Sequence, residues 1–275
     1  MGPRRLRHDV AACPAADGGR RAQALVYSST VELTGLSVLV PCLNEAGNLR
    51  ELVGRVRGAL ALPGAGPTDG PRELVLVDDG SSDGTWEVME ELRGGWEGLR
   101  TARHPRRRGI AQAWRTALDQ ARGGWVCTLD ADLQYEPEEL ARLWSVQRTS
   151  GADVVQGARA GDERPVDARW AASRGLNWLL NGVFRMSLRD NKSGFFLCRR
   201  QVLEALLGTR EGFRHWQCFV MVAAHHHGYQ ITDVETPFRP RRAGRSAFGR
   251  VPVGPTLGVL LDLTTAVRAY PRRRA

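Results

Sequence analysis

Two carboxylates and an amide alternate in the segment Thr128-Leu-Asp-Ala-Asp-Leu-Gln-Tyr135. The apolar run from Trp125 to Leu129 predicts a buried strand just before them. If the chain stays extended past that strand, Asp130, Asp132 and Gln134 point to one face, because successive side chains alternate between the two faces of a strand. Carboxylate and amide oxygens suit Mg²⁺ or Mn²⁺, and Mg²⁺ commonly completes its coordination with substrate phosphates. The spacing therefore predicts a divalent-metal site, although an isolated Asp-Ala-Asp is more often a solvated loop.

Two earlier segments repeat this plan of an apolar run followed by polar residues. Glu73-Leu-Val-Leu-Val-Asp-Asp-Gly-Ser-Ser-Asp-Gly-Thr85 predicts a strand, a turn and then a helix. Leu36-Ser-Val-Leu-Val-Pro-Cys-Leu-Asn-Glu45 predicts another strand, with Asn44 as the N-cap of the helix that follows. In open parallel sheets, ligands bind in the crevice beyond the carboxyl ends of the strands. We therefore expect the polar groups of all three strand ends to meet at one site.

Five motifs, in order along the chain, resemble those of the family 2 inverting glycosyltransferases with the GT-A fold. Within that family they look most like the dolichyl- or polyprenyl-phosphate mannose (sugar) synthases. The motifs are Pro41-Cys-Leu-Asn-Glu45, Val77-Asp-Asp-Gly-Ser-Ser-Asp-Gly-Thr85, Asp130-Ala-Asp-Leu-Gln134, Gln156-Gly-Ala-Arg159 and Ser193-Gly-Phe195. The resemblance covers the chain from about Leu36 to Gly249. It implies a single α/β domain of GT-A type, with a mostly parallel central sheet flanked by helices and a C-terminal amphipathic helix.

The resemblance also implies roles for individual residues. The motif that holds Mg²⁺ or Mn²⁺ and the donor diphosphate corresponds to Asp130, Ala131, Asp132 and Gln134. The positions that contact the nucleoside of a GDP- or UDP-hexose correspond to Pro41, Leu43, Glu45, Val77 and Asp79. The positions that hold phosphates correspond to Arg159, Arg169, Ser173 and Arg241. Arginine suits phosphate because its planar fork donates two parallel hydrogen bonds.

An inverting transfer is an in-line displacement whose main cost is the charge on the departing nucleoside diphosphate, so metal and arginine must carry that charge. Transfer to a sugar hydroxyl also needs a carboxylate base. A phosphate monoester has a second pKa of about 6, so it needs orientation rather than deprotonation. Asp190 is the spare carboxylate of the acceptor half, either as a catalytic residue or as a turn residue. The segment from Phe213 to Phe219 offers none, and Phe219 stands where the synthases often carry Glu.

The pattern departs from the synthases at Ala247, where they usually have a lysine after Gly-x-Ser. Arg245 is the candidate replacement for that donor-phosphate lysine; otherwise the donor differs.

Length and composition fit one catalytic domain. The chain has 275 residues, of which 42% are hydrophobic and 25% charged, enough for a full core. An odd number of cysteines without paired ligand spacing predicts reduced core residues in a cytosolic protein. They are Cys13, Cys42, Cys127, Cys198 and Cys218. No basic N-terminal stretch leads into a continuous apolar segment, and no window reaches about 18 uninterrupted apolar residues, so we expect neither a signal peptide nor a membrane span.

The net charge of +9 is concentrated at the two ends of the chain. Residues 1–28 carry five Arg against two Asp, and residues 239–275 carry nine Arg against one Asp. A near-neutral body with basic tails favours an anionic membrane surface over nucleic acid as partner. Plainly solvated tails are the alternative, and genome composition is another source of the arginine excess.

The chain divides into four parts. Residues 1–30 predict a disordered basic tail, 31–159 the nucleotide-sugar half of the domain, 160–249 its acceptor half, and 250–275 a C-terminal appendage. The stretch from Thr256 to Val267 is too short to span a membrane, but Leu257, Leu260 and Leu261 form an apolar strip for docking on one. The alternative is a last helix packed on the domain's own core.

Together these patterns predict a metal-dependent inverting glycosyltransferase on the cytoplasmic membrane face. It would move a hexose, of mannose or glucose type, from a nucleotide sugar to a polyprenyl (dolichyl-like) phosphate. A membrane-embedded partner subunit is another way to reach that lipid. One alternative uses a hydroxyl acceptor, such as a polysaccharide or a secondary metabolite. The other is an inactive sugar-nucleotide-binding scaffold subunit, against which the intact Asp-Ala-Asp-Leu-Gln motif argues.

Overall fold

The computed structural model describes residues 34–159, 168–209, 212–241 and 253–271. The predicted N-terminal tail, Cys13, and the departure at Ala247 lie outside these ranges. Among the helices of the described ranges, none combines the length and the apolar character that crossing a membrane requires.

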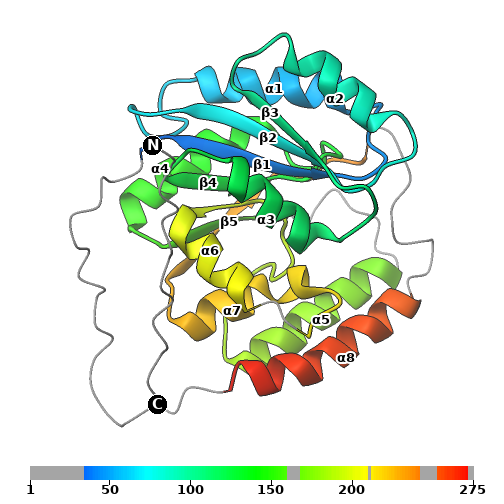
Figure 1. The fold of residues 1–275 in the computed structure, drawn as a ribbon. Helices are drawn as coiled ribbons and strands as arrows, with labels where there is room; N and C mark the ends of the chain where they lie inside the picture. Colours follow the sequence, from blue (N-terminus) through cyan, green and yellow to red (C-terminus); the bar gives the residue numbers. More distant parts are fainter. Residues whose placement is uncertain (1–33, 160–167, 210–211, 242–252, 272–275) are drawn as a thin grey trace, which may run out of the picture. The chain divides into compact units, whose positions relative to one another are not determined.

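Seven strands form one sheet in the order β3-β2-β1-β4-β6-β5-β7 (Figure 1). They are β1 (Leu36–Cys42), β2 (Arg72–Asp78), β3 (Leu99–Arg103), β4 (Trp125–Thr128), β5 (Val154–Arg159), β6 (Phe196–Arg199) and β7 (Ile231–Thr236). β6 runs antiparallel to both of its neighbours, and every other pair is parallel. The predicted α/β class with a mostly parallel sheet is thus confirmed.

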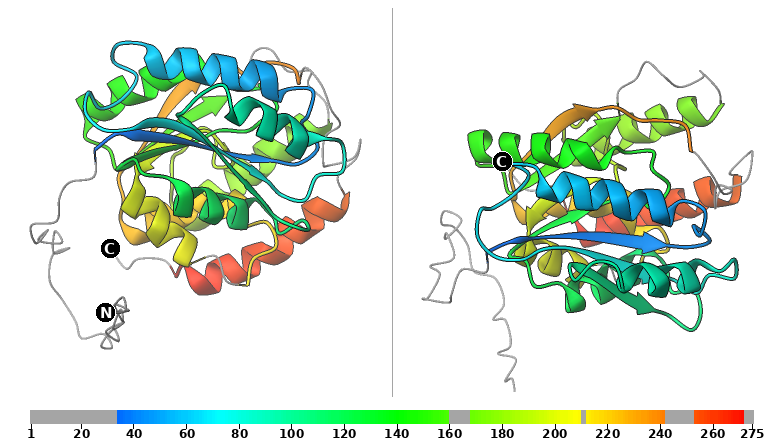
Figure 2. Two further views of the ribbon diagram at one scale, coloured as in Figure 1. Left: turned by 45° about the horizontal axis from the view of Figure 1, so that its top comes forward. Right: turned by 90° about the horizontal axis from the view of Figure 1, so that it is seen from above.

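Helices cover both faces of this sheet (Figures 1 and 2). On one face lie α1 (Leu49–Ala61), α2 (Thr85–Arg93) and α4 (Leu140–Ser150), the last preceded by the short η1 (Pro137–Glu139). On the other lie α3 (Ile110–Gln120), α5 (Ala168–Phe184), α6 (Arg200–Gly208), η3 (Trp216–Phe219), α7 (Val220–His227) and α8 (Val253–Ala269). Covering on both faces explains why the central strands read as continuous apolar runs.

The structure brings seven chain segments of the described ranges to one edge of the sheet. The six parallel strands β1, β2, β3, β4, β5 and β7 all end there. Because β6 is reversed, the loop before it, residues 190–195, reaches the same edge from the opposite direction. Residues that follow six strands and precede a seventh therefore lie along one edge.

Two local predictions at this edge are wrong. The chain does not stay extended past β4: residues 131–134 form a turn in which Leu133 has a positive φ of 58°. The Asp132 carboxylate stabilises that turn by accepting the backbone N–H of Gln134 at 3.1 Å. Asn44 is not the N-cap of α1, a position that Asn48 holds. The side-chain oxygen of Asn44 instead accepts the N–H of Ser82 at 2.9 Å and so joins the loops after β1 and β2.

Helix α8 packs one face on the domain core. Val259, Ala266 and Tyr270 are buried there. Asp262 also points inward, and its carboxylate accepts the backbone N–H groups of Arg214 and His215, the latter at 2.6 Å. The predicted alternative of core packing therefore holds for the inner face.

Four of the predicted core cysteines lie in the described ranges and none is in a disulfide; Cys42, Cys127 and Cys198 are buried, and Cys218 is half-buried. Burial raises the pKa of all four thiols, as expected of reduced core residues.

Candidate active site

Asp130 and Asp132 come together just beyond the end of β4. Burial and the neighbouring charge of Asp132 raise the pKa of Asp130 to about 7. Burial likewise raises the pKa of Asp132. Asp130 lies directly against Gly194 in the loop before β6, where a Cβ atom would stand 2.8 Å from a carboxylate oxygen. Any larger residue at that position would therefore push the Asp130 carboxylate out of its place.

Arg241 bridges this carboxylate pair to the loop after β1. Its Nη2 donates to Asp132 Oδ2 at 2.7 Å, and its Nη1 donates to Glu45 Oε1 at 2.9 Å. Burial raises the pKa of Glu45, although hydrogen bonds from Asn48 and Arg241 oppose the shift. Residues about two hundred positions apart thus share one charge network, and sequence spacing carried no sign of it.

The chemistry of this pair fits a divalent cation. Two close carboxylates that repel each other enough to raise a pKa are the hard oxygen ligands that Mg²⁺ or Mn²⁺ prefers. Within the described ranges, no cluster of three or more His, Cys, Asp and Glu side chains is placed to hold a metal. Phosphate oxygens and waters would then supply the remaining ligands, as is common for Mg²⁺.

The other residues of this motif are placed differently. The side-chain nitrogen of Gln134 donates to the carbonyl of Arg239 at 3.2 Å. This bond connects the turn after β4 to the segment before Arg241. Ala131 is buried, with 4% of its surface exposed. The predicted metal role of Gln134 therefore stays a prediction, and the structure gives it a second task.

Residues at the ends of β1 and β2 frame the other side of the site. Pro41 and Leu43 are half-buried, so both offer surface to a ligand. Val77 is fully buried, which leaves only its backbone for a nucleoside.

Asp79 has three hydrogen-bonding partners within the protein. It contacts the ring of His104, Nδ1 to Oδ1, at 2.8 Å and accepts the backbone N–H groups of Arg108 and Gly109, also at 2.8 Å. The other ring nitrogen of His104 lies 2.9 Å from the hydroxyl of Thr116. Asp79 thus fixes the loop between β3 and α3, and its predicted contact with a nucleoside stays a prediction. His104 was missed because its partner lies far from it in the sequence.

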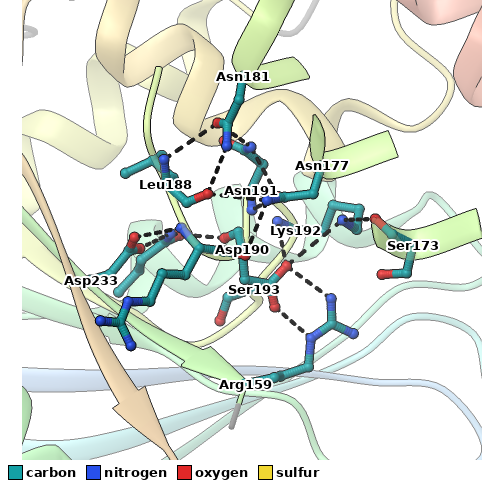
Figure 3. Close-up of polar contacts among 12 residues, drawn as sticks. Arg159, Ser173, Asn177, Asn181, Leu188, Asp190, Asn191, Lys192, Ser193 and Asp233 are labelled. Atoms are coloured by element: carbon teal, nitrogen blue, oxygen red, sulfur yellow. Dashed lines mark hydrogen bonds and ion pairs between the residues drawn. The ribbon is translucent and has the colours of Figure 1, made fainter. Parts of the chain in front are cut away.

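Arg159 and Asp190 form a buried ion pair (Figure 3). Arg159 donates through Nε and Nη2, the second bond being 2.8 Å long. Although burial opposes it, the charge and hydrogen bonds of Arg159 lower the pKa of Asp190. The guanidinium also lies 5.5 Å from the centre of the Phe238 ring. Both side chains are therefore engaged with each other.

Helix α5 holds the loop that carries Asp190 (Figure 3). Asn177 donates to the carbonyls of Leu188 and Arg189, both at 3.0 Å, and accepts the N–H of Asn191 at 2.7 Å. Asn181 donates to the carbonyl of Leu188 at 2.8 Å. These two asparagines, one helical turn apart, were not predicted from the sequence.

Lys192, the single lysine of the chain, lies in the same cluster. Its Nζ donates to the carbonyl of Ser173 at 3.0 Å and lies 3.8 Å from Asp190 Oδ1. Ser173 is thus near the Arg159–Asp190 pair through its backbone carbonyl, and its phosphate-holding role stays a prediction. The side chain of Arg169 lies outside the described part of the chain.

A family model described as glycosyl transferase family 2 matches residues 37–207. Two curated relatives are named undecaprenyl-phosphate 4-deoxy-4-formamido-L-arabinose transferase. The one from Yersinia enterocolitica is 29% identical over 247 residues, covering 90% of this chain and 71% of that protein. The one from Pseudomonas aeruginosa (strain LESB58) is 31% identical over 241 residues, covering 86% of this chain and 66% of that protein.

Solved structures share the fold at lower identity. Glucosyl-3-phosphoglycerate synthase from Mycobacterium tuberculosis, in complex with Mn²⁺, UDP and glucosyl-3-phosphoglycerate, is 19% identical, with a TM-score of 0.61 over 88% of this chain and 82% of that one. S. aureus TarS 1-349 is 20% identical, with a TM-score of 0.52 over 74% of this chain and 58% of that one. The sheet and its flanking helices are therefore of the GT-A type.

Proposed function

This chain belongs to glycosyl transferase family 2, and we propose that it transfers a sugar from a nucleotide donor to a polyprenyl phosphate. The observation that carries the proposal is the meeting of Asp130 and Asp132 with Arg241 at one edge of the sheet. Two carboxylates can bind a cation, and neighbouring arginines can bind phosphates. This combination suits a reaction in which both the donor and the acceptor are anions. The names of the curated relatives support the same acceptor class.

We assign Asp130 and Asp132 to the cation and Arg241 to phosphate. A bound Mg²⁺ or Mn²⁺ would offset the negative charge that develops on the leaving diphosphate. Pro41, Leu43 and Glu45 would line the nucleoside side, with Val77 offering its backbone. Arg159, held by Asp190, would orient the acceptor phosphate together with Ser173 and Arg169.

The state of Asp190 favours a phosphate over a hydroxyl acceptor. A general base needs a pKa near the working pH, whereas ion pairing with Arg159 lowers the pKa of Asp190. A phosphate monoester is already largely ionised at neutral pH, with a second pKa of about 6. We therefore assign Asp190 the positioning of Arg159 rather than proton transfer.

The donor sugar has two candidates. The resemblance to mannose synthases favours a GDP- or UDP-hexose. The names of the relatives favour a 4-deoxy-4-formamido pentose instead. A screen of nucleotide sugars for thermal stabilisation with Mn²⁺ separates them.

The acceptor is tested by incubating the enzyme and the stabilising donor with a polyprenyl phosphate or with the matching polyprenol. We expect transfer to the phosphate only, and loss of transfer with EDTA or in Asp132→Asn. Arg241→Ala should lower kcat/KM by about tenfold or more, since a hydrogen bond to a charged group contributes about 1.5–3 kcal/mol. Equal transfer to the polyprenol would favour the hydroxyl-acceptor alternative. Donor binding without any transfer would favour the scaffold subunit.

We also propose that the enzyme works while attached to an anionic membrane surface on the cytoplasmic side. The outer face of α8 exposes Leu260 and Leu261, with 44% and 55% of their surfaces accessible. On α5, which covers the same face of the sheet, Trp178 is 79% exposed. Contiguous apolar patches mark interaction surfaces, and the neighbouring Leu260 and Leu261 would form the centre of such a patch.

A further inference from the structure

The bridge made by Arg241 occupies an oxygen that a metal ion would need. Arg241 Nη2 lies 2.7 Å from Asp132 Oδ2, and the other oxygen of that carboxylate accepts the N–H of Gln134 at 3.1 Å. All three side chains of the bridge are largely enclosed, with exposed fractions of 26% for Arg241, 10% for Glu45 and 9% for Asp132. Little water is therefore available to replace a partner that leaves.

The two ends of the bridge differ in how firmly they are held. Glu45 is fixed on three sides: its Oε2 accepts from Asn48 at 2.6 Å, its N–H donates to Thr85 Oγ1 at 2.9 Å, and its Oε1 accepts from Arg241. Asp132 lies in the turn after β4, and apart from Arg241 its carboxylate contacts the N–H of Gln134 in that same turn, at 3.1 Å. The Glu45 end is thus the fixed end, and the Asp132 end is the one that can exchange.

A cation bound between Asp130 and Asp132 would repel the guanidinium at this distance, because like charges in a site of low dielectric interact strongly. Nη2 must then leave Asp132. With Nη1 still on Glu45, Nη2 would then be placed to donate to an acceptor phosphate beside the cation.

We infer that Glu45 is a positioning residue that anchors Arg241, so that binding of the divalent cation switches Arg241 from Asp132 to the substrate phosphate. This inference rests on the proposed function and adds a binding order to it: the cation before the acceptor phosphate. It also predicts a reciprocal coupling, since each ligand must change the affinity of the other by the same factor.

The first test measures Mn²⁺ affinity by electron paramagnetic resonance, with no activity readout. Arg241→Ala removes the competitor for Asp132 and should tighten Mn²⁺ binding by about tenfold. Arg241→Gln should do the same, which guards against a folding defect in one variant. Arg239→Ala is the matched control, because it removes the same charge two residues away from a side chain paired with Glu136. Unchanged or weaker Mn²⁺ binding in both Arg241 variants would overturn the inference.

The second test measures binding of a short-chain prenyl phosphate by calorimetry, with and without Mn²⁺. In the wild type, Mn²⁺ should strengthen this binding by about tenfold or more, and Arg241→Ala should remove most of that gain. Glu45→Gln should also reduce it, because the anchor of Arg241 is lost. Glu138→Gln, which breaks an exposed pair with Arg55 away from the site, should not. A full gain in Glu45→Gln would leave Glu45 without the anchoring role.

The two proposals fail separately. If the wild type transfers sugar to polyprenyl phosphate but Arg241→Ala does not tighten Mn²⁺, only the exchange of Arg241 is wrong. If the wild type binds neither Mn²⁺ nor the prenyl phosphate, the proposed function is wrong as well.

Discussion

Two carboxylates at the same edge of the sheet, Asp130 and Asp190, have opposite pKa shifts. Both are buried, which by itself raises a carboxyl pKa. Asp190 has Arg159 as a close partner, and its pKa is lowered. Asp130 faces a second carboxylate, and its pKa is raised to about 7. The residue type was predictable from the sequence, but the role depends on the partner that the fold brings.

Mn²⁺ affinity should therefore depend on pH. A cation must displace the proton that Asp130 holds below its raised pKa of about 7. Between pH 8 and pH 6 the affinity should fall, by up to about tenfold per unit below that pKa. Electron paramagnetic resonance at pH 6, 7 and 8 measures this. Asp130→Asn should bind weakly at every pH, and a wild-type affinity that is constant over this range would contradict the assignment of Asp130.

Removing the carboxylate of Asp190 should destabilise the fold. Asp190→Asn leaves Arg159 buried without its charge partner, a change that costs about 3 kcal/mol in other proteins. Because the folded pKa of Asp190 is lowered, the pair stabilises above the unfolded pKa of about 3.9 and is lost as the pH falls further. Urea unfolding should thus show a large effect at pH 7 and a smaller one near pH 3.

The matched control for this prediction is Glu235→Gln, which breaks an exposed pair with Arg189. Exposed pairs contribute about 1 kcal/mol or less. Equal destabilisation by the two substitutions would show that the Arg159–Asp190 pair is not special.

At the level of elements, apolar runs and breakers predicted most of the fold. The strands before Asp78 and Asp130 lie where expected, and the helix predicted after the second of the three polar segments begins at Thr85. These signals are local, since each depends on side chains a few positions apart. The two wrong predictions have a common physical cause. The side chains of Asn44 and Asp132 accept hydrogen bonds from backbone N–H groups, which favours turns over the predicted N-cap and extended chain.

Contacts between residues far apart in the sequence could not be predicted from local sequence patterns. Asn177 and Asn181 look like ordinary helix residues, yet they hold the loop from Leu188 to Asn191. Asp262 looked like an interruption of an apolar strip, yet it accepts N–H groups at the start of η3. Predicting them requires knowing which elements pack together.

The α5 asparagines give a prediction at this scale. Asn177→Ala removes bonds to two carbonyls and to the N–H of Asn191, so three backbone groups of the loop lose their partner. Unfolding free energy should fall by about 2–3 kcal/mol, and amide hydrogens of residues 188–191 should exchange faster. Thr149→Ala, which removes only a hydroxyl bonded within its own helix, should change neither. Unaltered exchange in Asn177→Ala would show that α5 does not hold the loop.

At the scale of the whole molecule, the single reversed strand is what completes the site. Were β6 parallel to its neighbours, the loop with Asp190, Lys192 and Gly194 would reach the opposite edge. Resemblance to a known family predicted the mostly parallel sheet but not the reversed strand, and hydrophobic patterning alone predicted strands without their order. The order matters most for function, because it brings Gly194 against Asp130.

The second whole-molecule feature is the outward face of α8. Its inner residues are committed to the core, so Leu260 and Leu261 are exposed by the same packing that fixes the helix. Arg268 in the last turn adds a positive charge near this face. Burying half-exposed leucines in the membrane interface contributes about 1 kcal/mol for each, and each basic residue near anionic lipid adds about as much.

Reversible binding to anionic vesicles is therefore the last prediction. Leu260→Ser with Leu261→Ser should weaken sedimentation with such vesicles by about tenfold, and Trp178→Ser should weaken it further. Leu62→Ser is the matched control, because Leu62 has the same 44% exposure as Leu260 but follows α1 at the far edge of the sheet. Transfer to a long polyprenyl phosphate in vesicles should fall with binding, while transfer to a short soluble analogue should not. If the double variant sediments like the wild type, the outer face of α8 is not the docking surface. If the wild type does not bind vesicles at all, a membrane-embedded partner subunit becomes the better account of how the enzyme reaches its lipid.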